Sequence, residues 1–304
     1  MFMKKTILFI ISSFLILGCE DNNINIDQRY IELCGDVQLQ KSDFSVLSFN
    51  RLNNTSLNSV SAVIDQVNPD IIGLQESYEI GKQIADRYNY CFFGSDGMST
   101  AYLSRFPIEV INDTHIKIEL SADKAINFMN VHLKAFPYQP YDIRDTLITT
   151  DSQAIHQAEQ TRGANVDVLV DNINLVIKNE PLIICGDFNE PSHLDWVENA
   201  ENPVRFLINN NQFTVDWPTS NKIANVGMKD SYRELFSSPV QFPGYTWTPQ
   251  ISNDEVYDRI DMIYHNSLLN VNDFKIIGPD DQSDIKLIDF ESDHRAVYAV
   301  FSFD

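Results

Sequence analysis

Residues 181–191 read PLIICGDFNEP, and the predicted fold can be built outward from this stretch. Its first part, residues 182–185, is a short unbroken apolar run, typical of a strand buried on both faces. We expect Gly186 to let the chain turn where that strand leaves the core. Asp187 and Asn189 follow, and residues two apart in an extended chain point the same way. The pattern predicts a carboxylate and a carboxamide held over one site, although an Asx-rich turn after a strand fits GDFN equally well.

Other apolar runs also end on a polar side chain. Strands are predicted at residues 44–50, 71–76, 90–93, 100–104, 108–111, 125–133, 257–264 and 296–303. Helical spacing of apolar residues predicts helices at 57–67, 79–88 and 151–178, the last with Thr150 or Asp151 as N-cap and a weak point at Gly163. Residues 134–149 are rich in Pro and Tyr and are expected to form a long loop. If the strands pack side by side in two sheets flanked by helices, their polar ends converge on one rim.

The N-terminus is a separate segment. Lys4 and Lys5 precede an apolar run, residues 7–17, that is too short to span a bilayer comfortably. Its ending resembles a bacterial lipobox, which implies cleavage of a signal peptide (1–18) before Cys19 and lipidation of that thiol; an ordinary secretory signal is the alternative. The polar residues 19–42 are typical of a flexible tether. We therefore expect a lipid-anchored, extracytoplasmic protein of the bacterial cell envelope, with one catalytic domain at 43–304.

The charge of the chain argues against tight nucleic-acid binding. The net charge is −21, and removal of residues 1–18 would leave 20 basic against 43 acidic residues, or −23. Non-specific binding to a polyanion needs clustered Lys and Arg, and the sequence contains no such cluster. A stable nucleic-acid complex is therefore not expected.

Three cysteines follow Cys19, and none has zinc-site spacing. Cys185 falls in a predicted buried strand and is interpreted as a small core residue. A disulfide between Cys34 and Cys91 is allowed in an exported protein, but the sequence leaves it undetermined.

Eight short motifs together indicate a family. They are SFN (48–50), LQE (74–76), LSRFP (103–107), NVHL (130–133), GDFN (186–189), YTW (245–247), RID (259–261) and SDHR (292–295). In order and spacing they resemble the endonuclease/exonuclease/phosphatase superfamily, which includes deoxyribonuclease I, abasic-site nucleases of the exonuclease III type and neutral sphingomyelinases. The resemblance covers residues 43–303. It implies a four-layered α/β sandwich, with two mainly antiparallel sheets packed face to face between helices, and a metal-dependent phosphoesterase.

The resemblance also implies roles for particular residues. Glu76 is similar to the principal Mg²⁺ ligand, with Asn50 close by and Asp293 as a further ligand; Mn²⁺ is the alternative ion. Carboxylate and carboxamide oxygens suit such hard cations. Cys19 remains the lipidation site expected from the lipobox.

The catalytic residues implied by the resemblance are His132, Asp187, Asn189, Asp261 and His294. His294 would activate the attacking water or contact the phosphate, and Asp261 would orient it, although Asp258 could share that role. His132 would face a phosphate oxygen or the leaving group. Asp187 and Asn189 would position the nucleophile and the phosphate. A histidine beside a carboxylate suits this chemistry because it can take and give a proton near neutral pH.

Candidate substrate contacts are less sharply indicated. Arg105, Arg144 and Arg162 could bind an anionic substrate, but salt bridges within so acidic a chain are at least as expected. His193 follows GDFN and could help line the pocket. An aromatic wall for an organic substrate group could come from Tyr138, Tyr141, Trp196, Trp217 and Trp247, although the resemblance favours a structural role for Trp247.

The sequence thus predicts an exported, monomeric, Mg²⁺-dependent phosphoesterase that hydrolyses a diester or monoester of a small or lipid-derived substrate. A secreted endonuclease of the deoxyribonuclease type is the alternative, and a non-catalytic binding lipoprotein is a third. Fold alone does not choose among substrates.

Overall fold

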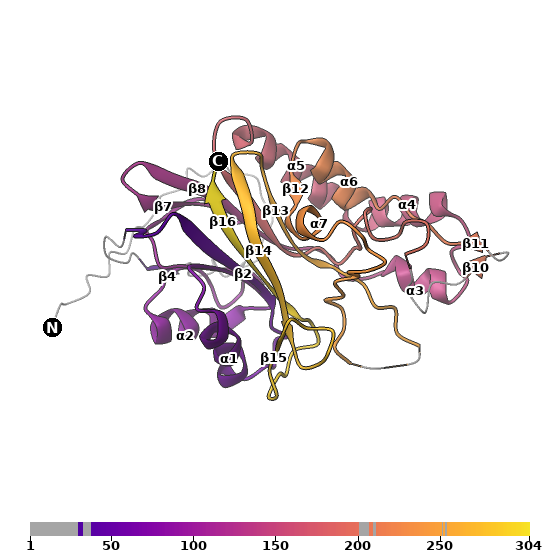
Figure 1. Cartoon of the computed structure of the whole chain (residues 1–304), viewed down its shortest axis with the longest axis horizontal. Helices are drawn as coiled ribbons and strands as arrows, with labels where there is room; N and C mark the ends of the chain where they lie inside the picture. The colour runs from indigo at the N-terminus through magenta and orange to yellow at the C-terminus, as the bar shows by residue number, and fades with distance from the viewer. Residues whose placement is uncertain (1–29, 33–37, 201–206, 209–210, 251, 253) are drawn as a thin grey trace, which may run out of the picture.

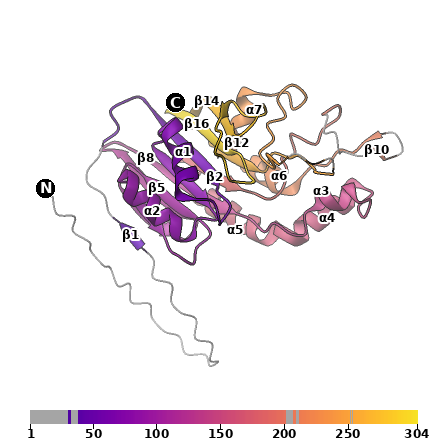
Figure 2. The ribbon, with the colours of Figure 1, turned by 90° about the horizontal axis from the view of Figure 1, so that it is seen from below.

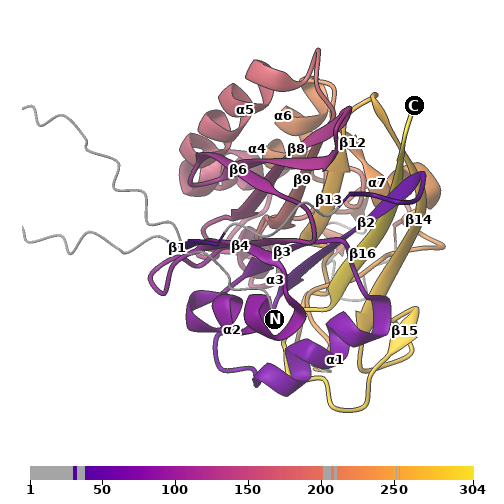
Figure 3. The same cartoon turned by 90° about the vertical axis from the view of Figure 1, so that its left-hand side faces the viewer.

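Two β-sheets packed face to face form the centre of the molecule. The computed structural model describes residues 30–32, 38–200, 207–208, 211–250, 252 and 254–304. Within them, helices cover the outer face of each sheet, so the expected four-layered α/β sandwich is confirmed (Figure 3). The signal peptide, Cys19, Cys34 and most of the predicted tether lie outside the described residues. None of the described helices has the length and apolar character needed to cross a bilayer.

The first sheet contains eight strands. In spatial order they are β1 (Tyr30–Glu32), β4 (Cys91–Gly94), β5 (Ala101–Ser104), β3 (Ile71–Gln75), β2 (Asp43–Asn50), β16 (Ala296–Phe303), β14 (Leu269–Gly278) and β15 (Ile285–Lys286). Neighbours are antiparallel except for the pairs β2–β3 and β14–β15.

The second sheet contains six strands. In spatial order they are β12 (Lys229–Asp230), β13 (Asp261–His265), β9 (Leu182–Asp187), β8 (Lys124–His132), β7 (His115–Ser121) and β6 (Ile108–Asn112). Only β8 and β9 pair in parallel. A short hairpin, β10 (Leu207–Ile208) with β11 (Asn211–Gln212), stands apart from both sheets.

Three apolar layers hold the sandwich together. Phe44 and Val46 of β2 face the layer between the sheets, and Leu47 and Phe49 face the helices. This alternation follows from the period of two along a strand, with both faces buried. The outer layers are formed against α1 (Leu57–Val67) and α2 (Tyr78–Tyr88) on one side, and against α5 (Ala164–Val176) and α6 (Pro218–Asn225) on the other (Figure 1).

A helical arm extends beyond the end of the sandwich. It contains α3 (Gln139–Arg144), α4 (Asp151–Ala158) and a π-helical segment (Glu159–Gly163) that leads into α5 (Figure 2). The expectation of a long loop at 134–149 is therefore wrong in part, because α3 lies within it. Pro at the first turn of α3 has a fixed φ that suits a helix start. A further short helix, α7 (Ser231–Leu235), follows the N-cap Asp230.

Two local predictions need correction. Gly186 lies within β9 and does not end it: its φ is 149°, and a Cβ there would lie 2.0 Å from the backbone oxygen of Val131 on β8. Glycine is needed for close approach of two strands, and the strand continues to Asp187. The strand predicted at 257–264 begins only at Asp261.

Candidate active site

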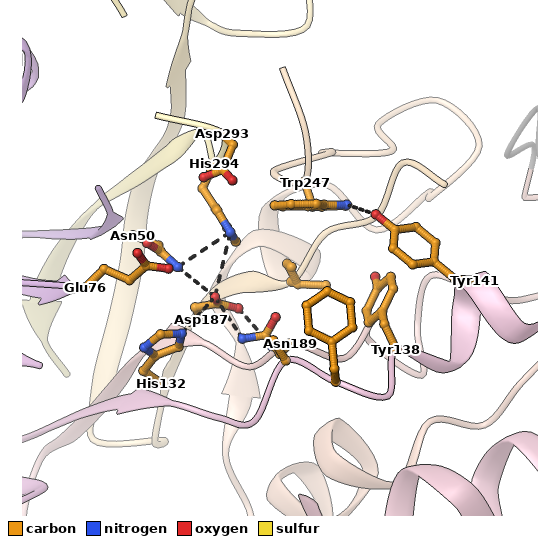
Figure 4. A pocket seen from close by; sticks show the side chains of 13 residues that line it. Asn50, Glu76, His132, Tyr138, Tyr141, Asp187, Asn189, Trp247, Asp293 and His294 are labelled. Carbon is orange, nitrogen blue, oxygen red and sulfur yellow. Dashed lines mark hydrogen bonds and ion pairs between the residues drawn. The ribbon is translucent and has the colours of Figure 1, made fainter. Parts of the chain in front are cut away.

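The polar ends of several strands meet at one rim of the sandwich and line a cavity of about 160 Å³. β2 runs parallel to β3 in one sheet, and β8 runs parallel to β9 in the other. Residues at or directly after the carboxyl ends of all four strands line the cavity. The lining residues are Asn50, Glu76, His132, Ala135, Phe136, Tyr138, Tyr141, Asp187, Asn189, Trp247, Ile260, Asp293 and His294. Figure 4 shows their polar groups on one side of the site and their aromatic rings on the other.

The Asp187 carboxylate lies at the centre of this polar group. Its Oδ2 accepts hydrogen bonds from Asn50 Nδ2 at 2.9 Å and from Asn189 Nδ2 at 3.0 Å. The Nε2 atoms of His132 and His294 lie 3.7 Å and 3.8 Å from the same oxygen. One carboxylate oxygen therefore faces four nitrogen groups from four separate segments of the chain.

Asn189 reaches Asp187 through a turn. Its φ is 50°, in the left-handed region, and its backbone N–H donates to Asp187 Oδ1 at 2.9 Å. This is an Asx turn, to which Asn is well suited. The convergence of the two side chains was predicted, but the extended chain expected between them is wrong.

His294 is held by Asp261 on its other side. The distance from His294 Nδ1 to Asp261 Oδ2 is 2.9 Å, and both residues are buried. Burial alone would lower the pKa of His294, but the negative charges of Asp261 and Asp187 and the hydrogen bond to Asp261 raise it to about 10. These charges favour the protonated imidazole, which can donate a hydrogen bond through Nε2 toward the cavity.

Asp258 does not share the orienting role for His294. Its Oδ2 accepts a hydrogen bond from the Tyr138 hydroxyl at 2.8 Å, and its Oδ1 accepts one from Trp196 Nε1 at 2.7 Å. Of the two aspartates in the DRID sequence, Asp261 is the one that contacts His294. Asp258 instead accepts hydrogen bonds from the two aromatic side chains.

The three residues expected to bind metal lie along one wall of the cavity. Asp293 Oδ1 is buried and has no hydrogen-bond partner, and burial, with the charges of Glu76 and Asp187, raises the pKa of Asp293. An unpaired buried carboxylate oxygen near other acids is costly unless a cation balances it. Glu76, Asn50 and Asp293 therefore fit a hard divalent cation.

A second group could also hold an ion. Ligand atoms of Asp187, Asp261 and His294 all lie within 4.8 Å of one another. Here, however, His294 Nδ1 is already bonded to Asp261, and Asp187 already accepts from two carboxamides. Asp261 Oδ1 and Asp293 Oδ1 are both buried without a hydrogen-bond partner, but Asp293 lines the cavity and Asp261 does not. We therefore favour the wall of Glu76, Asn50 and Asp293 for the cation.

Aromatic rings form the opposite side of the cavity. Trp247 Nε1 donates to the Tyr141 hydroxyl at 3.1 Å, and the Trp247 ring lies 4.8 Å from the His294 ring. Tyr138 and Phe136 complete this side. Phe136 was missed by the sequence analysis, although its place in an aromatic-rich segment was a usable signal. Trp196 and Trp217 do not line the cavity and pack against each other in a separate core.

The structure does not bring the candidate arginines to the cavity. Arg162 is buried and paired with Glu190 at 2.9 Å. Arg144 pairs with Asp145 at 2.7 Å, and Arg105 Nε lies 3.9 Å from Asp70 Oδ1. These contacts match the salt-bridge alternative. His193 also lies off the lining, with Nδ1 2.9 Å from Ser220 Oγ.

Sequence comparison connects this geometry to known proteins. Residues 43–294 match the profile of the Endonuclease/Exonuclease/phosphatase family. The uncharacterized protein F14F9.5 of Caenorhabditis elegans is 25% identical over 272 residues, which cover 78% of this chain and 82% of that protein.

Solved structures share the fold at low sequence identity. A 3′ phosphatase, NExo from Neisseria bound to a product DNA hairpin, matches with a TM-score of 0.58 and 17% identity over 86% of this chain and 99% of its own. TDP2 of D. rerio with a single-strand DNA product matches with a TM-score of 0.54 and 18% identity, over 86% of this chain and 100% of its own. An AP endonuclease of Archaeoglobus fulgidus matches with a TM-score of 0.55 and 18% identity, over 86% of this chain and 99% of its own.

Proposed function

This chain belongs to the Endonuclease/Exonuclease/phosphatase family and is a metal-dependent phosphoric ester hydrolase, and on that basis we propose that it hydrolyses a small or lipid-derived phosphate ester with Mg²⁺. Mn²⁺ is the second choice of ion. One observation carries the proposal: the cavity has acids, carboxamides and histidines on one side and aromatic rings on the other. The phosphoryl group would occupy the polar side, and an organic substituent would contact the rings.

Hydrolysis requires a positioned water, a proton acceptor for it and stabilisation of the leaving oxygen. In the proposal, Asp187 orients the water and takes its proton, because its carboxylate is held at the centre of the polar group. The P–O bond to the substituent then breaks as the bond from water to phosphorus forms. His294 donates a hydrogen bond to a phosphoryl oxygen, and His132 protonates the leaving oxygen.

Glu76, Asn50 and Asp293 would hold the cation, on the evidence of the unpaired Asp293 oxygen. When bound, Mg²⁺ there would neutralise negative charge on the phosphoryl oxygens. Asn53 N–H donates to Glu76 Oε2 at 2.8 Å, so the Glu76 carboxylate is already oriented by the loop that follows β2.

Charge supports a small substrate over nucleic acid. The net charge is −21, and the described residues lining the cavity include neither Lys nor Arg. Binding of an extended polyanion relies on such groups. A substrate whose charge is confined to one phosphate needs only the cation and the two histidines.

The proposal includes a location at the bacterial cell envelope. The support is sequence alone: the lipobox-like ending at Cys19 and the polar tether after it. A monomer tethered outside the cytoplasm would meet lipid-derived or small soluble esters at the membrane surface. Labelling of Cys19 by a radioactive fatty acid in cells, absent from Cys19→Ser, would test the anchor.

Side-by-side hydrolysis tests the proposed activity. The full-length chain would be assayed on bis(p-nitrophenyl) phosphate, p-nitrophenyl phosphate and plasmid DNA, with Mg²⁺ and with EDTA. We expect metal-dependent cleavage of a chromogenic ester with DNA spared. Glu76→Gln should reduce kcat by about a hundredfold or more because it removes a metal-binding charge. Unchanged turnover in that variant or in EDTA would refute the assignment.

A deoxyribonuclease-type activity is the second candidate. It is favoured by similarity to solved structures that contain DNA products, a hairpin in one case and a single strand in another. Divalent ions would then have to offset the acidic surface. Degradation of plasmid DNA at moderate salt, faster than cleavage of the small esters, would establish this alternative.

A further inference from the structure

A second buried carboxylate lies beside the cavity and has no part in the proposed hydrolysis. Asp258 is 1% exposed and does not line the cavity. Its two oxygens accept hydrogen bonds from different aromatic residues, Tyr138 at 2.8 Å and Trp196 at 2.7 Å. Tyr138 lines the cavity, whereas Trp196 is buried in the core below the helical arm. Asp258 therefore connects a cavity ring to a fixed part of the core.

The backbone of Asp258 holds a second cavity ring. Its N–H donates to Trp247 O at 2.8 Å, and Trp247 N–H donates to Asp258 O at 2.9 Å. This pair of bonds fixes the chain at Trp247, whose ring lies 4.8 Å from that of His294. One residue thus sets two rings of the aromatic side, one through its side chain and one through its backbone.

We infer that Asp258 is a specificity-positioning residue: it holds Tyr138 beside Trp247 to form an aromatic slot that selects phosphate esters carrying a flat apolar substituent. The inference rests on the proposed function for the place of the phosphate. The cavity of about 160 Å³ has polar groups on one side and aromatic rings on the other, so a flat ring attached to the phosphate would contact the aromatic side (Figure 4).

The chemistry of the contacts predicts different results for different substitutions. Asp258→Asn can keep both bonds, since its oxygen can accept from Trp196 and its amide can donate to the Tyr138 oxygen. Asp258→Ala leaves both aromatic donors without this acceptor, so the Tyr138 ring loses its fixed position. Tyr138→Phe keeps the ring and removes only its bond to Asp258.

Binding of two phosphonates tests the slot without turnover. Calorimetry would compare phenylphosphonate and methylphosphonate on the full-length chain with Mg²⁺, since the two ligands differ in the ring. We expect about tenfold tighter binding of phenylphosphonate by the unmodified chain. The preference should disappear in Asp258→Ala, fall about threefold in Tyr138→Phe and persist in Asp258→Asn, with methylphosphonate binding unchanged.

A matched control is Tyr88→Phe, which removes a hydroxyl that donates to Asp65 on the helices outside the cavity and should change neither affinity. Equal affinity of the unmodified chain for both phosphonates would overturn the inference. Equal weakening of both by Asp258→Ala or by Tyr138→Phe would also overturn it, because a merely structural role would act in that way. Hydrolysis of p-nitrophenyl esters, measured on the same samples, tests the proposed function separately from the slot. If the chain preferred phenylphosphonate but hydrolysed no ester, the proposed function would be refuted and the inference about the slot would still hold.

Discussion

At the scale of single residues, the proposed chemistry depends on the hydrogen bond between Asp261 and His294. The 2.9 Å contact fixes the ring so that Nε2 faces Asp187. Asp261→Asn would keep the shape but remove the charge that helps keep His294 protonated. We expect kcat to fall about 10²- to 10⁴-fold, with little change in KM. Steady-state kinetics on bis(p-nitrophenyl) phosphate at saturating Mg²⁺ measure this.

The control for that prediction is Asp123→Asn, which removes a carboxylate from the exposed turn between β7 and β8, at the opposite end of β8 from His132. It should leave kcat within about twofold of the unmodified value, as surface substitutions usually do. If Asp261→Asn behaved in the same way, His294 would not depend on Asp261 for its role.

A second residue-scale prediction concerns stability and pH. Burial lowers the pKa of His265 to about 4 although Glu234 lies 3.2 Å away. An unfolded histidine has a pKa of about 6.5, so between these values the unfolded chain binds a proton that the folded chain does not. The contribution of neutral His265 to the free energy of unfolding is therefore fully present above about pH 6.5. It decreases by about 2–3 kcal/mol as the pH falls toward 4.

Urea unfolding at pH 7.5 and pH 5 measures this loss. His265→Gln has no titrating group and should lose about 1–2 kcal/mol less than the unmodified chain between the two pH values. Its stability at pH 7.5 should be lower, because the bond between Ser231 and the His265 ring is altered. An identical pH dependence in both proteins would show that His265 is not responsible.

Residue-level prediction succeeded where a strand end determines the position of a side chain. Asn50, Glu76 and His132 lie at or directly after their strands, so the sequence alone brings them to one rim. The sequence alone did not predict the position of Arg162, because its partner Glu190 lies next to it only in the folded chain. The position of a charged side chain then depends on a tertiary contact that no local pattern records.

At the scale of elements, the long helix expected at 151–178 is one continuous helical segment with an irregular middle. Five residues, Glu159–Gly163, are π-helical, and the expected weak point Gly163 ends that segment. Arg162 lies in it, buried, and donates to Glu190 and to Lys134 O. The π-helical segment thus connects the helical arm to the strand end that carries Asp187. Such segments often occur near functional sites.

Replacing one residue of the buried ion pair between Arg162 and Glu190 should lower the free energy of unfolding. Both side chains of the Arg162–Glu190 pair are 0% exposed, and Arg162→Met would leave Glu190 charged and buried. We expect a loss of about 3–5 kcal/mol in the free energy of unfolding. The double variant Arg162→Met with Glu190→Gln should recover part of it. Urea unfolding at neutral pH is the measurement.

Lys222→Met is the matched control, because Lys222 pairs with Glu159 of the same π-helical segment at 2.8 Å with both groups part-exposed. An exposed pair contributes about 0–1 kcal/mol, so the loss should be small. Equal losses in Lys222→Met and Arg162→Met would contradict the assignment of a special role to the buried pair.

The longest strand, β14, was missed, and a bulge explains why. Its inward residues Leu269 and Val271 alternate with exposed ones, but the register shifts between Val271 and Asp273, and burial resumes at Phe274. A bulge adds one residue and reverses the phase of the alternation. A pattern of period two therefore breaks in mid-strand, whereas β16, which has no such shift, was predicted from end to end.

At the scale of the whole molecule, the site exists only because two sheets meet in a fixed register. Behind the cavity, in the layer between the sheets, Gln75 Nε2 donates to Asn130 Oδ1 at 2.6 Å. Asn130 Nδ2 in turn donates to Leu74 O and Ala101 O, both at 3.0 Å. Glu76 follows Gln75 directly, and His132 lies two residues beyond Asn130. This network connects Glu76, the proposed metal ligand, in one sheet to His132, the proposed proton donor, in the other.

Asn130→Ala should therefore reduce both stability and turnover. The buried Gln75 amide would lose its shortest hydrogen bond, at a cost of about 1–3 kcal/mol. Because Glu76 and His132 would no longer be held in register, we expect kcat to fall about tenfold or more. Asn127→Ala is the matched control: Asn127 is buried in the same strand but bonds to His115 Nε2 at 2.8 Å, away from the cavity. It should lose similar stability and keep kcat. Equal losses of kcat in both variants would mean that turnover follows general stability, and the fixed register between the sheets would then not be what positions the site.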